Sequence, residues 1–288
     1  MTAKIKLENV TYTYGKGTPF EVTALDSVDL EIKAGLITGI IGHTGSGKST
    51  LVRLFNGLEK PESGKVLLDG ADIWEKPREI GKVRFRVGLV MQYPEYQLFE
   101  ETVAADIAFG PRNMGLDGAE TDRRVAEYAA LTGISKAELE KSPFDLSGGQ
   151  KRRAAIAGVM AMEPEVLVLD EPAAGLDPEG KRLILGAVRE YAARRGATVI
   201  IVSHSMDDMA ELCDRVVVVA DGKILCDGTR DEVFGKAEML VAAGLDIPEL
   251  TRVSLLLAAR GYRTEKTVYT LADATSEILK LYDRRTTK

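Results

Sequence analysis

The stretch GHTGSGKST at residues 42–50 constrains the fold of this chain more than any other. It fits the pattern G-x-x-x-x-G-K-S/T, it directly follows the apolar run LITGII (36–41), and the helix-like segment STLVRLFNGL comes after it. A buried strand, a glycine-rich turn and a helix in this order bind phosphate through backbone N–H groups and the helix N-terminus. A flexible glycine turn before an ordinary helix is the weaker alternative. We predict a phosphate-binding loop in a layered α/β domain.

Each position of this loop has a predicted role. Lys48 is expected to reach the β- and γ-phosphates of a nucleotide, and the hydroxyl of Ser49 to ligate Mg²⁺. The glycines allow the tight turn, and we interpret His43 as a tolerated variable position. The predicted nucleotide-binding positions of the loop are Gly42, His43, Thr44, Gly45, Ser46, Gly47, Lys48, Ser49 and Thr50.

The stretch VLVLDEP (166–172) supplies the second half of the predicted site. A buried strand that ends in a carboxylate places Asp170 at the carboxyl edge of the sheet, where it can hold Mg²⁺. Glu171 points elsewhere and is a candidate to polarise the attacking water. For an isolated Asp-Glu-Pro a strand-ending turn would be the better interpretation, but the phosphate loop upstream favours the catalytic one.

The rest of the chain divides into regions of different periodicity. Alternating residues in IKLENVTYTY and VDLEIK predict antiparallel strands, and RVVVVADGKILCDG predicts a hairpin. TVIIVS (198–203) is another buried strand, whereas residues 98–162 have helical periodicity and predict an inserted helical subdomain. We predict one domain over residues 1–232 and a small accessory domain over residues 233–288.

Composition excludes several classes of protein. The net charge of −6 argues against a nucleic-acid partner, and the triplet Lys151–Arg153 is interpreted as a solvated helix face. No apolar run approaches the roughly 18 residues of a membrane span, and no signal peptide is evident. Cys213 and Cys226 fit no metal or redox spacing. We expect a cytosolic chain that only a partner could hold at a membrane.

Up to this point the chain could be any of many nucleotide hydrolases built on one scaffold. The stretch LSGGQ (146–150) resembles the signature of the ABC ATPases, and five further motifs match that family in order. Tyr14 has the position of the adenine-stacking aromatic, Gln92 that of the Q-loop glutamine, and His204 in IVSHS completes the set. The resemblance covers about residues 3–230. It implies a cassette with a RecA-like, mainly parallel sheet, an antiparallel β subdomain and an inserted helical subdomain.

The resemblance also implies a head-to-tail dimer with ATP between the phosphate loop of one subunit and LSGGQ of the other. On the residues alone, Ser147 before the helical run QKRRAAIAGVMAM predicts a second phosphate-facing helix terminus. By resemblance, Asp177 crosses the interface, His204 contacts the γ-phosphate, and Gln92 joins Ser49 and Asp170 at Mg²⁺. The nucleotide contacts outside the loop would be Tyr14, Ser147, Gly148, Gly149, Gln150 and Asp177, and the catalytic residues Lys48, Gln92, Glu171 and His204.

Within the ABC family, the stretch QYPEYQLFEETVAADIAFGPRNMG and the tail PELTRVSLLLAARGY resemble the ATPases of energy-coupling factor transporters. Met91 and Ala173 depart from that pattern, where Phe and Thr are usual. The resemblance implies an importer of a vitamin or metal ion. It implies a homodimer or heterodimer of ATPases, a membrane coupling subunit with basic helices, and a substrate-binding membrane component contacted indirectly. The chain would work at the cytoplasmic face of the cell membrane.

The acidic, aromatic stretch after Gln92 fits such a partner. A groove lined by carboxylates would bind the arginines of a coupling helix, and aromatic rings would anchor that helix. The proposed docking residues are Tyr93, Glu95, Tyr96, Phe99, Glu100 and Glu101, together with Asp106. A solvated acidic loop over core aromatics is the alternative.

Two other functions fit the sequence less well. A soluble ABC ATPase acting on ribosomes or DNA usually carries two cassettes or a long coiled coil, and neither pattern is present here. A regulatory subunit with an inactive site would not need Lys48, Asp170, Glu171 and His204 together.

Overall fold

The computed structural model describes residues 2–262, 264 and 268–286 of the chain. Its centre is a six-stranded sheet in the order β10-β9-β3-β8-β7-β6. The strands are β3 (Ile37–Ile41), β6 (Val87–Val90), β7 (Val166–Asp170), β8 (Thr198–Val202), β9 (Arg215–Ala220) and β10 (Lys223–Thr229). Five of them run parallel and β10 pairs antiparallel with β9, as the hairpin pattern predicted. Every residue of β3, β7 and β8 is buried, which explains their continuous apolar sequences.

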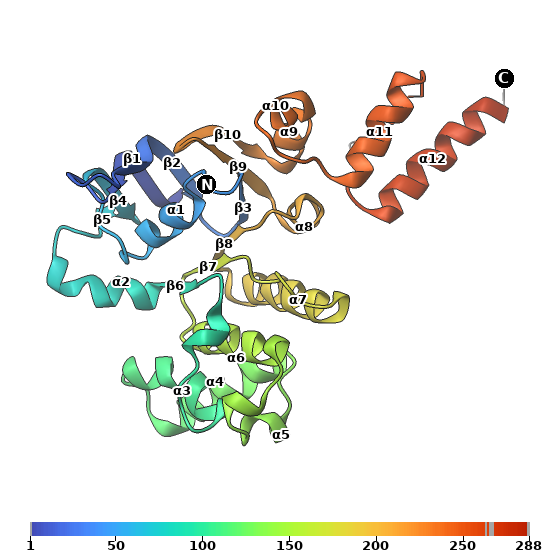
Figure 1. The fold of residues 1–288 in the computed structure, drawn as a ribbon. Coiled ribbons are helices and arrows are strands. Elements are labelled where there is room, and N and C mark those ends of the chain that lie inside the picture. The colour runs from blue at the N-terminus through green and yellow to red at the C-terminus, as the bar shows by residue number, and fades with distance from the viewer. Residues whose placement is uncertain (1, 263, 265–267, 287–288) are drawn as a thin grey trace.

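A second sheet is antiparallel and has the order β2-β1-β4-β5. Its strands are β1 (Ala3–Tyr14), β2 (Val22–Lys33), β4 (Ser63–Leu68) and β5 (Ala71–Asp72). Helix α1 (Lys48–Phe55) lies beside both sheets (Figure 1), and its Leu51, Leu54 and Phe55 belong to the same buried apolar cluster as Leu7 of β1 and Ile40 of β3. The phosphate-loop helix is therefore held rigidly from both sides.

A lobe of helices enters between β6 and β7 in the sequence (Figure 1). Helix α2 (Ile80–Arg86) leads into β6, and the short 3-10 turns are η1 (Pro77–Glu79), η2 (Pro94–Gln97) and η3 (Pro143–Asp145). The helices of the lobe are α3 (Val103–Asn113), α4 (Gly118–Leu131), α5 (Lys136–Leu139) and α6 (Gly148–Ala161). After the lobe, α7 (Pro178–Arg195) and α8 (Met206–Leu212) flank the central sheet. The fold is thus an α/β cassette with a helical insertion, as expected from the sequence.

The last helices are α9 (Arg230–Phe234), α10 (Ala237–Ala242), α11 (Glu249–Ala259) and α12 (Leu271–Thr286). The domain boundary predicted after residue 232 falls inside α9, and the next residues, Val233, Phe234 and Leu240, belong to the main core. Helices α11 and α12 extend away from it (Figure 1), with exposed leucines such as Leu256 and Leu271. The division into domains stays a prediction. Within the described residues, each helix is too short or too polar to span a bilayer.

Candidate nucleotide-binding site

Close packing of the loop between β3 and α1 requires glycine at two positions. Gly47, the N-cap of α1, has a φ of 108°, and a Cβ there would lie 2.5 Å from the carbonyl oxygen of Ala24. A Cβ on Gly42 would come within 2.2 Å of the carbonyl oxygen of Val219. Neither contact is sterically possible, so these positions exclude any other residue. The loop can therefore bring backbone N–H groups close to an anion at the start of α1.

The Lys48 ammonium group bends over this loop. Its Nζ donates to the carbonyl oxygens of Gly42 at 2.7 Å and His43 at 2.8 Å. Burial lowers the pKa of Lys48 from its ordinary value, while the charges of Glu171 and Asp170 oppose that shift. Two neutral carbonyls can be exchanged for phosphate oxygens, and a partly desolvated ammonium gains from a charged partner.

The hydroxyl of Ser49 donates to Oδ2 of Asp170 at 2.9 Å, which joins the start of α1 to the end of β7. Asp170 is 6% exposed, and burial, together with the charge of Glu171, raises its pKa although Ser49 and Lys48 oppose the shift. A hydroxyl and a carboxylate are the hard oxygen donors that Mg²⁺ prefers. These two residues fit the predicted metal site.

Gln92, the third predicted Mg²⁺ ligand, follows β6 and is exposed. The hydrogen bond at this residue is made by its backbone carbonyl, which accepts from Arg152. In the described part of the chain no contact joins the Gln92 side chain to Ser49 or Asp170, so its metal role stays a prediction.

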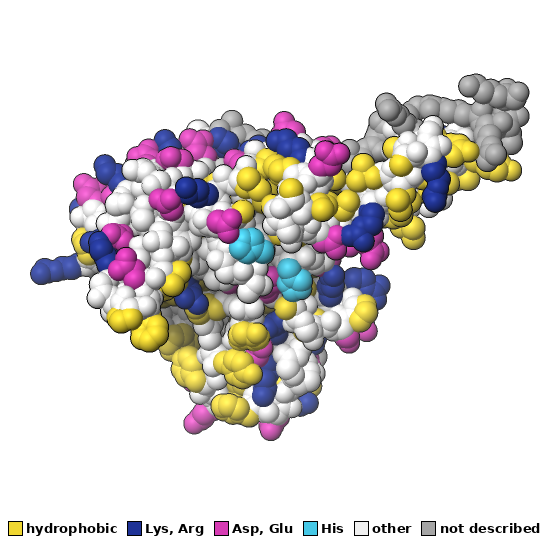
Figure 2. All heavy atoms as spheres, turned by 45° about the horizontal axis from the view of Figure 1, so that its top comes forward, with side chains coloured by type: hydrophobic (Ala, Val, Ile, Leu, Met, Phe, Trp, Pro, Cys, Tyr) yellow, Lys and Arg dark blue, Asp and Glu magenta, His cyan; other side chains and the backbone are white. Residues whose placement is uncertain are grey.

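Glu171 and His204 form a contact that the sequence does not predict. His204 Nδ1 lies 2.9 Å from Glu171 Oε1, and the His204 side chain is 77% exposed whereas Glu171 is almost buried. The two residues follow the neighbouring strands β7 and β8, so parallel pairing brings them together. Figure 2 shows the histidine side chains of the chain on one face, among acidic side chains. The γ-phosphate contact assigned to His204 stays a prediction, and its contact with Glu171 is additional.

Tyr14 lies beside the phosphate loop. Its hydroxyl is 3.1 Å from Oγ1 of Thr50, and its ring meets the ring of Tyr12 edge-on at 4.8 Å. Tyr12 in turn donates to Glu59 at 2.6 Å, and burial with this hydrogen bond raises the pKa of Tyr12 to about 12. An aromatic face at the loop suits stacking on a nucleotide base.

Ser147 and Asp177 serve as helix caps within the chain. Ser147 caps α6 in a reciprocal capping box with Gln150, and Asp177 accepts from the N–H of Gly180 at 2.7 Å to cap α7. Ser147 and Gly148 are exposed. Among the described residues no contact joins Ser147 to the loop at 42–50. The two predicted phosphate-binding termini therefore do not meet within one chain in this structure.

The solvated interpretation of the triplet Lys151–Arg153 is wrong for Arg152. This side chain is 4% exposed and pairs with Glu95, whose two oxygens lie 3.1 and 3.2 Å from its nitrogens. Lys151 instead lies over the ring of Phe144, 5.8 Å from its centroid. The sequence signal was weak, because the partner of Arg152 lies far away along the chain.

The acidic stretch is divided between interior and surface. Glu95 is occupied by Arg152, and Asp106 is buried and accepts from the backbone N–H groups of Phe99 and Glu100. Burial raises the pKa of Asp106. Both carboxylates hold the loop. Glu95 is already paired with Arg152, which removes it from the free set. Asp106 also lines the cavity beside Phe99, so its docking role stays a prediction.

The remaining docking candidates lie outside. Tyr93, Tyr96 and Phe99 are among the large exposed hydrophobic residues, and Glu101 is exposed. Beside them is a cavity of about 310 Å³ between the loop and helices α3 and α6. It is lined by residues that include Phe85, Leu98, Phe99, Phe109, Val159 and Met162.

Comparison with known proteins gives this geometry a family context. The family described as ABC transporter matches residues 25–174. The chain is 48% identical to the energy-coupling factor transporter ATP-binding protein EcfA2 of Clostridium tetani, over 98% of this chain and 99% of the relative. It is 51% identical to the protein of the same name from Symbiobacterium thermophilum, over 95% of each.

Solved structures agree. CbiO1 from Clostridium perfringens, described as part of the ABC transporter complex CbiONQ, has a TM-score of 0.74 and 40% identity, and the match covers 90% of this chain and all of that one. The ATP-binding cassette MJ0796, a dimer in a post-hydrolysis state bound to ADP and Pi, has a TM-score of 0.72 and 29% identity, over 78% of this chain and 98% of that one.

Proposed function

The chain belongs to the ABC transporter family, and from that premise we propose that it is the ATPase subunit of an energy-coupling factor importer for a vitamin or metal ion. It is an ABC ATPase, and it binds ATP with Mg²⁺. The observation that carries the proposal is the meeting of Lys48, the Ser49–Asp170 pair and the Glu171–His204 pair at one edge of the central sheet. An inactive regulatory subunit would not need this complete set.

The proposed mechanism assigns one task to each group. Lys48 would exchange the loop carbonyls for the phosphates, and Ser49 and Asp170 would hold Mg²⁺, which would neutralise charge on the phosphates. Glu171 accepts a proton from the attacking water, and His204 holds the Glu171 carboxylate in place. Tyr14 stacks on the base. Gln92 follows β6 and links the nucleotide to the loop of residues 93–101.

Ser147, Gly148, Gly149 and Gln150 are proposed to serve a second subunit. The exposure of Ser147 and Gly148 at the start of α6 supports this role, because an exposed helix N-terminus can bind an anion. The partner is a second copy or a related ATPase. Closure of the pair on ATP, and reopening after hydrolysis, would drive the membrane subunit.

A membrane subunit is proposed to dock on the cavity beside Phe99. The apolar lining from Phe85, Phe109 and Met162 suits one face of a helix, and the exposed rings of Tyr93 and Tyr96 provide anchors. Glu100 and Glu101 directly follow Phe99 in the sequence and would pair with arginines of that helix. The chain would thus be held at the cytoplasmic face of the cell membrane.

Purification from its own membranes tests the proposed function. The tagged chain, isolated in mild detergent, should carry an integral membrane subunit with arginine-bearing cytoplasmic helices, and the complex should hydrolyse ATP. Lys48→Met should keep the assembly and lose hydrolysis. Two results together would contradict the proposal. One is full ATPase activity in a preparation free of any membrane subunit, and the other is cellular uptake of vitamins and metal ions that is unchanged after deletion of the chain.

Charge reversal tests the docking surface. Glu100→Lys with Glu101→Lys should abolish assembly with the membrane subunit, since two attractive contacts become repulsive, while nucleotide binding stays intact. The matched control is Asp122→Lys with Glu238→Lys, which makes the same change in net charge at two exposed carboxylates elsewhere. Copurification in detergent is the measurement, and undiminished assembly of the first variant would refute the docking proposal.

A further inference from the structure

Arg152 connects three separate segments of the chain. From the second turn of α6 its Nε and Nη2 contact Glu95 at 3.1 and 3.2 Å, and Nη2 also donates to the carbonyl oxygen of Gln92 at 2.9 Å. Its Nη1 donates to the carbonyl oxygen of Ala174, in the segment after β7. The whole side chain is buried, so water competes little for these contacts.

The three segments have distinct tasks in the proposed function. Residues 92–95 begin with Gln92, the predicted Mg²⁺ ligand of this chain's own site, and residues 147–150 at the start of α6 are proposed to face the site of the neighbouring subunit. Ala174 lies between Glu171 and Asp177, so its segment joins the proposed base to the residue expected to cross the interface. One guanidinium group thus binds segments of the chain that serve both nucleotide sites.

We propose that Arg152 is a positioning residue that couples the two ATP sites by fixing residues 92–95 to residues 147–150 and 174–177 of the same chain. The inference rests on the proposed ATPase function and names the internal coupling of that site. It needs arginine specifically. A planar guanidinium can bind a carboxylate bidentately and still donate to two carbonyls, whereas a lysine ammonium is a point charge with three donors.

Arg152→Lys tests the proposal, because it keeps the charge and loses the fork. We expect kcat of the assembled complex to fall by about tenfold to a hundredfold, the range for losing one or two hydrogen bonds to a charged group. The Hill coefficient for ATP should approach 1, while the affinity of the isolated subunit for ATP stays unchanged. These readouts come from steady-state hydrolysis against ATP concentration and from fluorescent-nucleotide titration.

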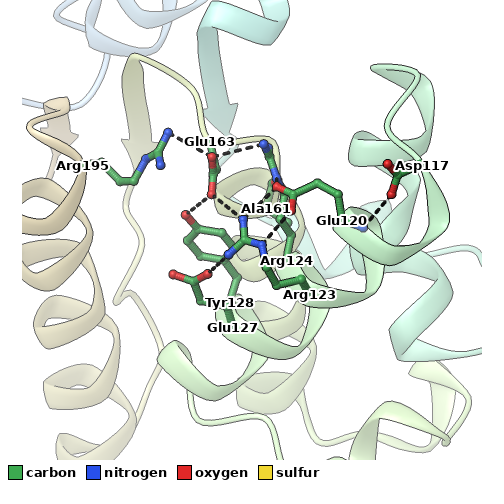
Figure 3. A network of polar contacts seen from close by, with 9 residues as sticks. All are labelled: Asp117, Glu120, Arg123, Arg124, Glu127, Tyr128, Ala161, Glu163 and Arg195. Atoms are coloured by element: carbon green, nitrogen blue, oxygen red, sulfur yellow. Dashed lines mark hydrogen bonds and ion pairs between the residues drawn. The ribbon is translucent and has the colours of Figure 1, made fainter.

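Arg124→Lys is the matched control. Arg124 in α4 is also a shielded guanidinium that pairs with two carboxylates, Glu120 at 2.7 Å and Glu163 at 3.2 Å, and donates to the carbonyl oxygen of Ala161 (Figure 3). It lies in the same lobe but contacts neither residues 92–95 nor Ala174 in the described structure. We expect Arg124→Lys to lower the thermal unfolding midpoint and to leave the Hill coefficient unchanged.

A second variant keeps the test valid if Arg152→Lys does not fold. Glu95→Gln removes the charge of the partner with little change of shape, and it should lower kcat and the Hill coefficient in the same direction. Where both variants fold, their combined effect on kcat should be smaller than the product of the single effects, because both break one interaction.

The outcomes separate the two proposals. A wild-type complex without ATPase activity contradicts the proposed function, whatever Arg152 does. An active wild type with Arg152→Lys and Glu95→Gln at the wild-type kcat and Hill coefficient contradicts the positioning role alone. Equal losses of the Hill coefficient in Arg124→Lys would also overturn it, because they would mean a general structural effect.

Discussion

Glu171 has a φ of 53°, and a left-handed backbone costs a non-glycine residue about 1–3 kcal/mol. Two contacts hold it there: its N–H donates to the carbonyl oxygen of Val202 at 2.9 Å, and its carboxylate meets His204. The strained turn directs the Glu171 side chain away from the path of β7, while Asp170 stays with Ser49. Adjacent carboxylates thereby contact different partners at one strand end.

Glu171→Gln tests the role of this carboxylate. Loss of a general base costs about 10²–10⁴ in rate, so the variant should bind ATP and fail to turn it over. Single-turnover hydrolysis with purified, assembled protein measures the chemical step directly. His204→Ala is the informative comparison, because it leaves the base in place and removes the group that orients it. Hydrolysis at the wild-type rate in Glu171→Gln would remove the residue from its role.

The phosphate-loop residues were predictable from sequence because their function depends on local spacing. Gly42, Gly47 and Lys48 act within seven residues of one another, and strand, turn and helix are contiguous. Arg152 was not predictable in this way. Its partner Glu95 is 57 residues distant, and a run of three basic residues resembles an exposed helix face whether or not a distant carboxylate covers one of them.

The candidate site lies at the carboxyl ends of the central strands. At the opposite edge of the sheet, ion pairs link several elements. Glu165, just before β7, accepts from Arg86 at the end of α2 and from Lys4 of β1. Asp69, after β4, pairs with the same two cations. The hydrogen bonds from Arg86 lower the pKa of Glu165 to about 2 from its ordinary 4.5. Strands β1 and β4 of one sheet, strand β7 of the other and helix α2 thus share one charge cluster.

Glu165→Gln should therefore reduce stability in a pH-dependent way. A carboxylate with a depressed pKa stabilises the fold fully above its unfolded value near 4.5, and this stabilisation disappears as the pH falls through about 2. Because Glu165 is 46% exposed, the difference is no more than about 1 kcal/mol. Urea unfolding at pH 6 and at successively lower pH measures it. A stability difference from wild type that grows on acidification would contradict the assignment.

A second network joins the helical lobe to the core. Glu163, between α6 and β7, pairs with Arg124 of α4 at 3.2 Å and with Arg195 of α7 at 2.9 Å (Figure 3). Tyr128 also donates to Glu163 at 3.1 Å. Helical periodicity predicted the helices of the lobe, but ion pairs between helices depend on relative orientation, which periodicity does not carry. The contacts that hold the lobe needed the structure.

At the scale of the whole molecule, the two predicted phosphate-binding helix termini lie on different parts of the chain. Helix α1 begins at Lys48 within the sandwich of sheets, and α6 begins at Gly148 in the helical lobe (Figure 1). The sequence predicted both termini, and the resemblance to ABC ATPases implied that they meet only between subunits. Exposure of Ser147 and Gly148 agrees with that arrangement.

Gly148→Asp tests the subunit pairing without disturbing the fold. A Cβ at Gly148 meets no atom within 4 Å, and a carboxylate in the first turn of a helix favours the helix itself. The same carboxylate would repel a triphosphate bound by the neighbouring subunit.

In a Glu171→Gln background, where ATP is not consumed, we expect ATP with Mg²⁺ to yield a dimer. Adding Gly148→Asp should leave a folded subunit that binds ATP and stays monomeric in light scattering, whereas Gly148→Ala, which fills the same open space without charge, should still dimerise. If the Gly148→Asp variant still formed an ATP-dependent dimer, with the same dimerisation affinity as its Glu171→Gln parent, this would show that residues 147–150 do not face the nucleotide of the partner.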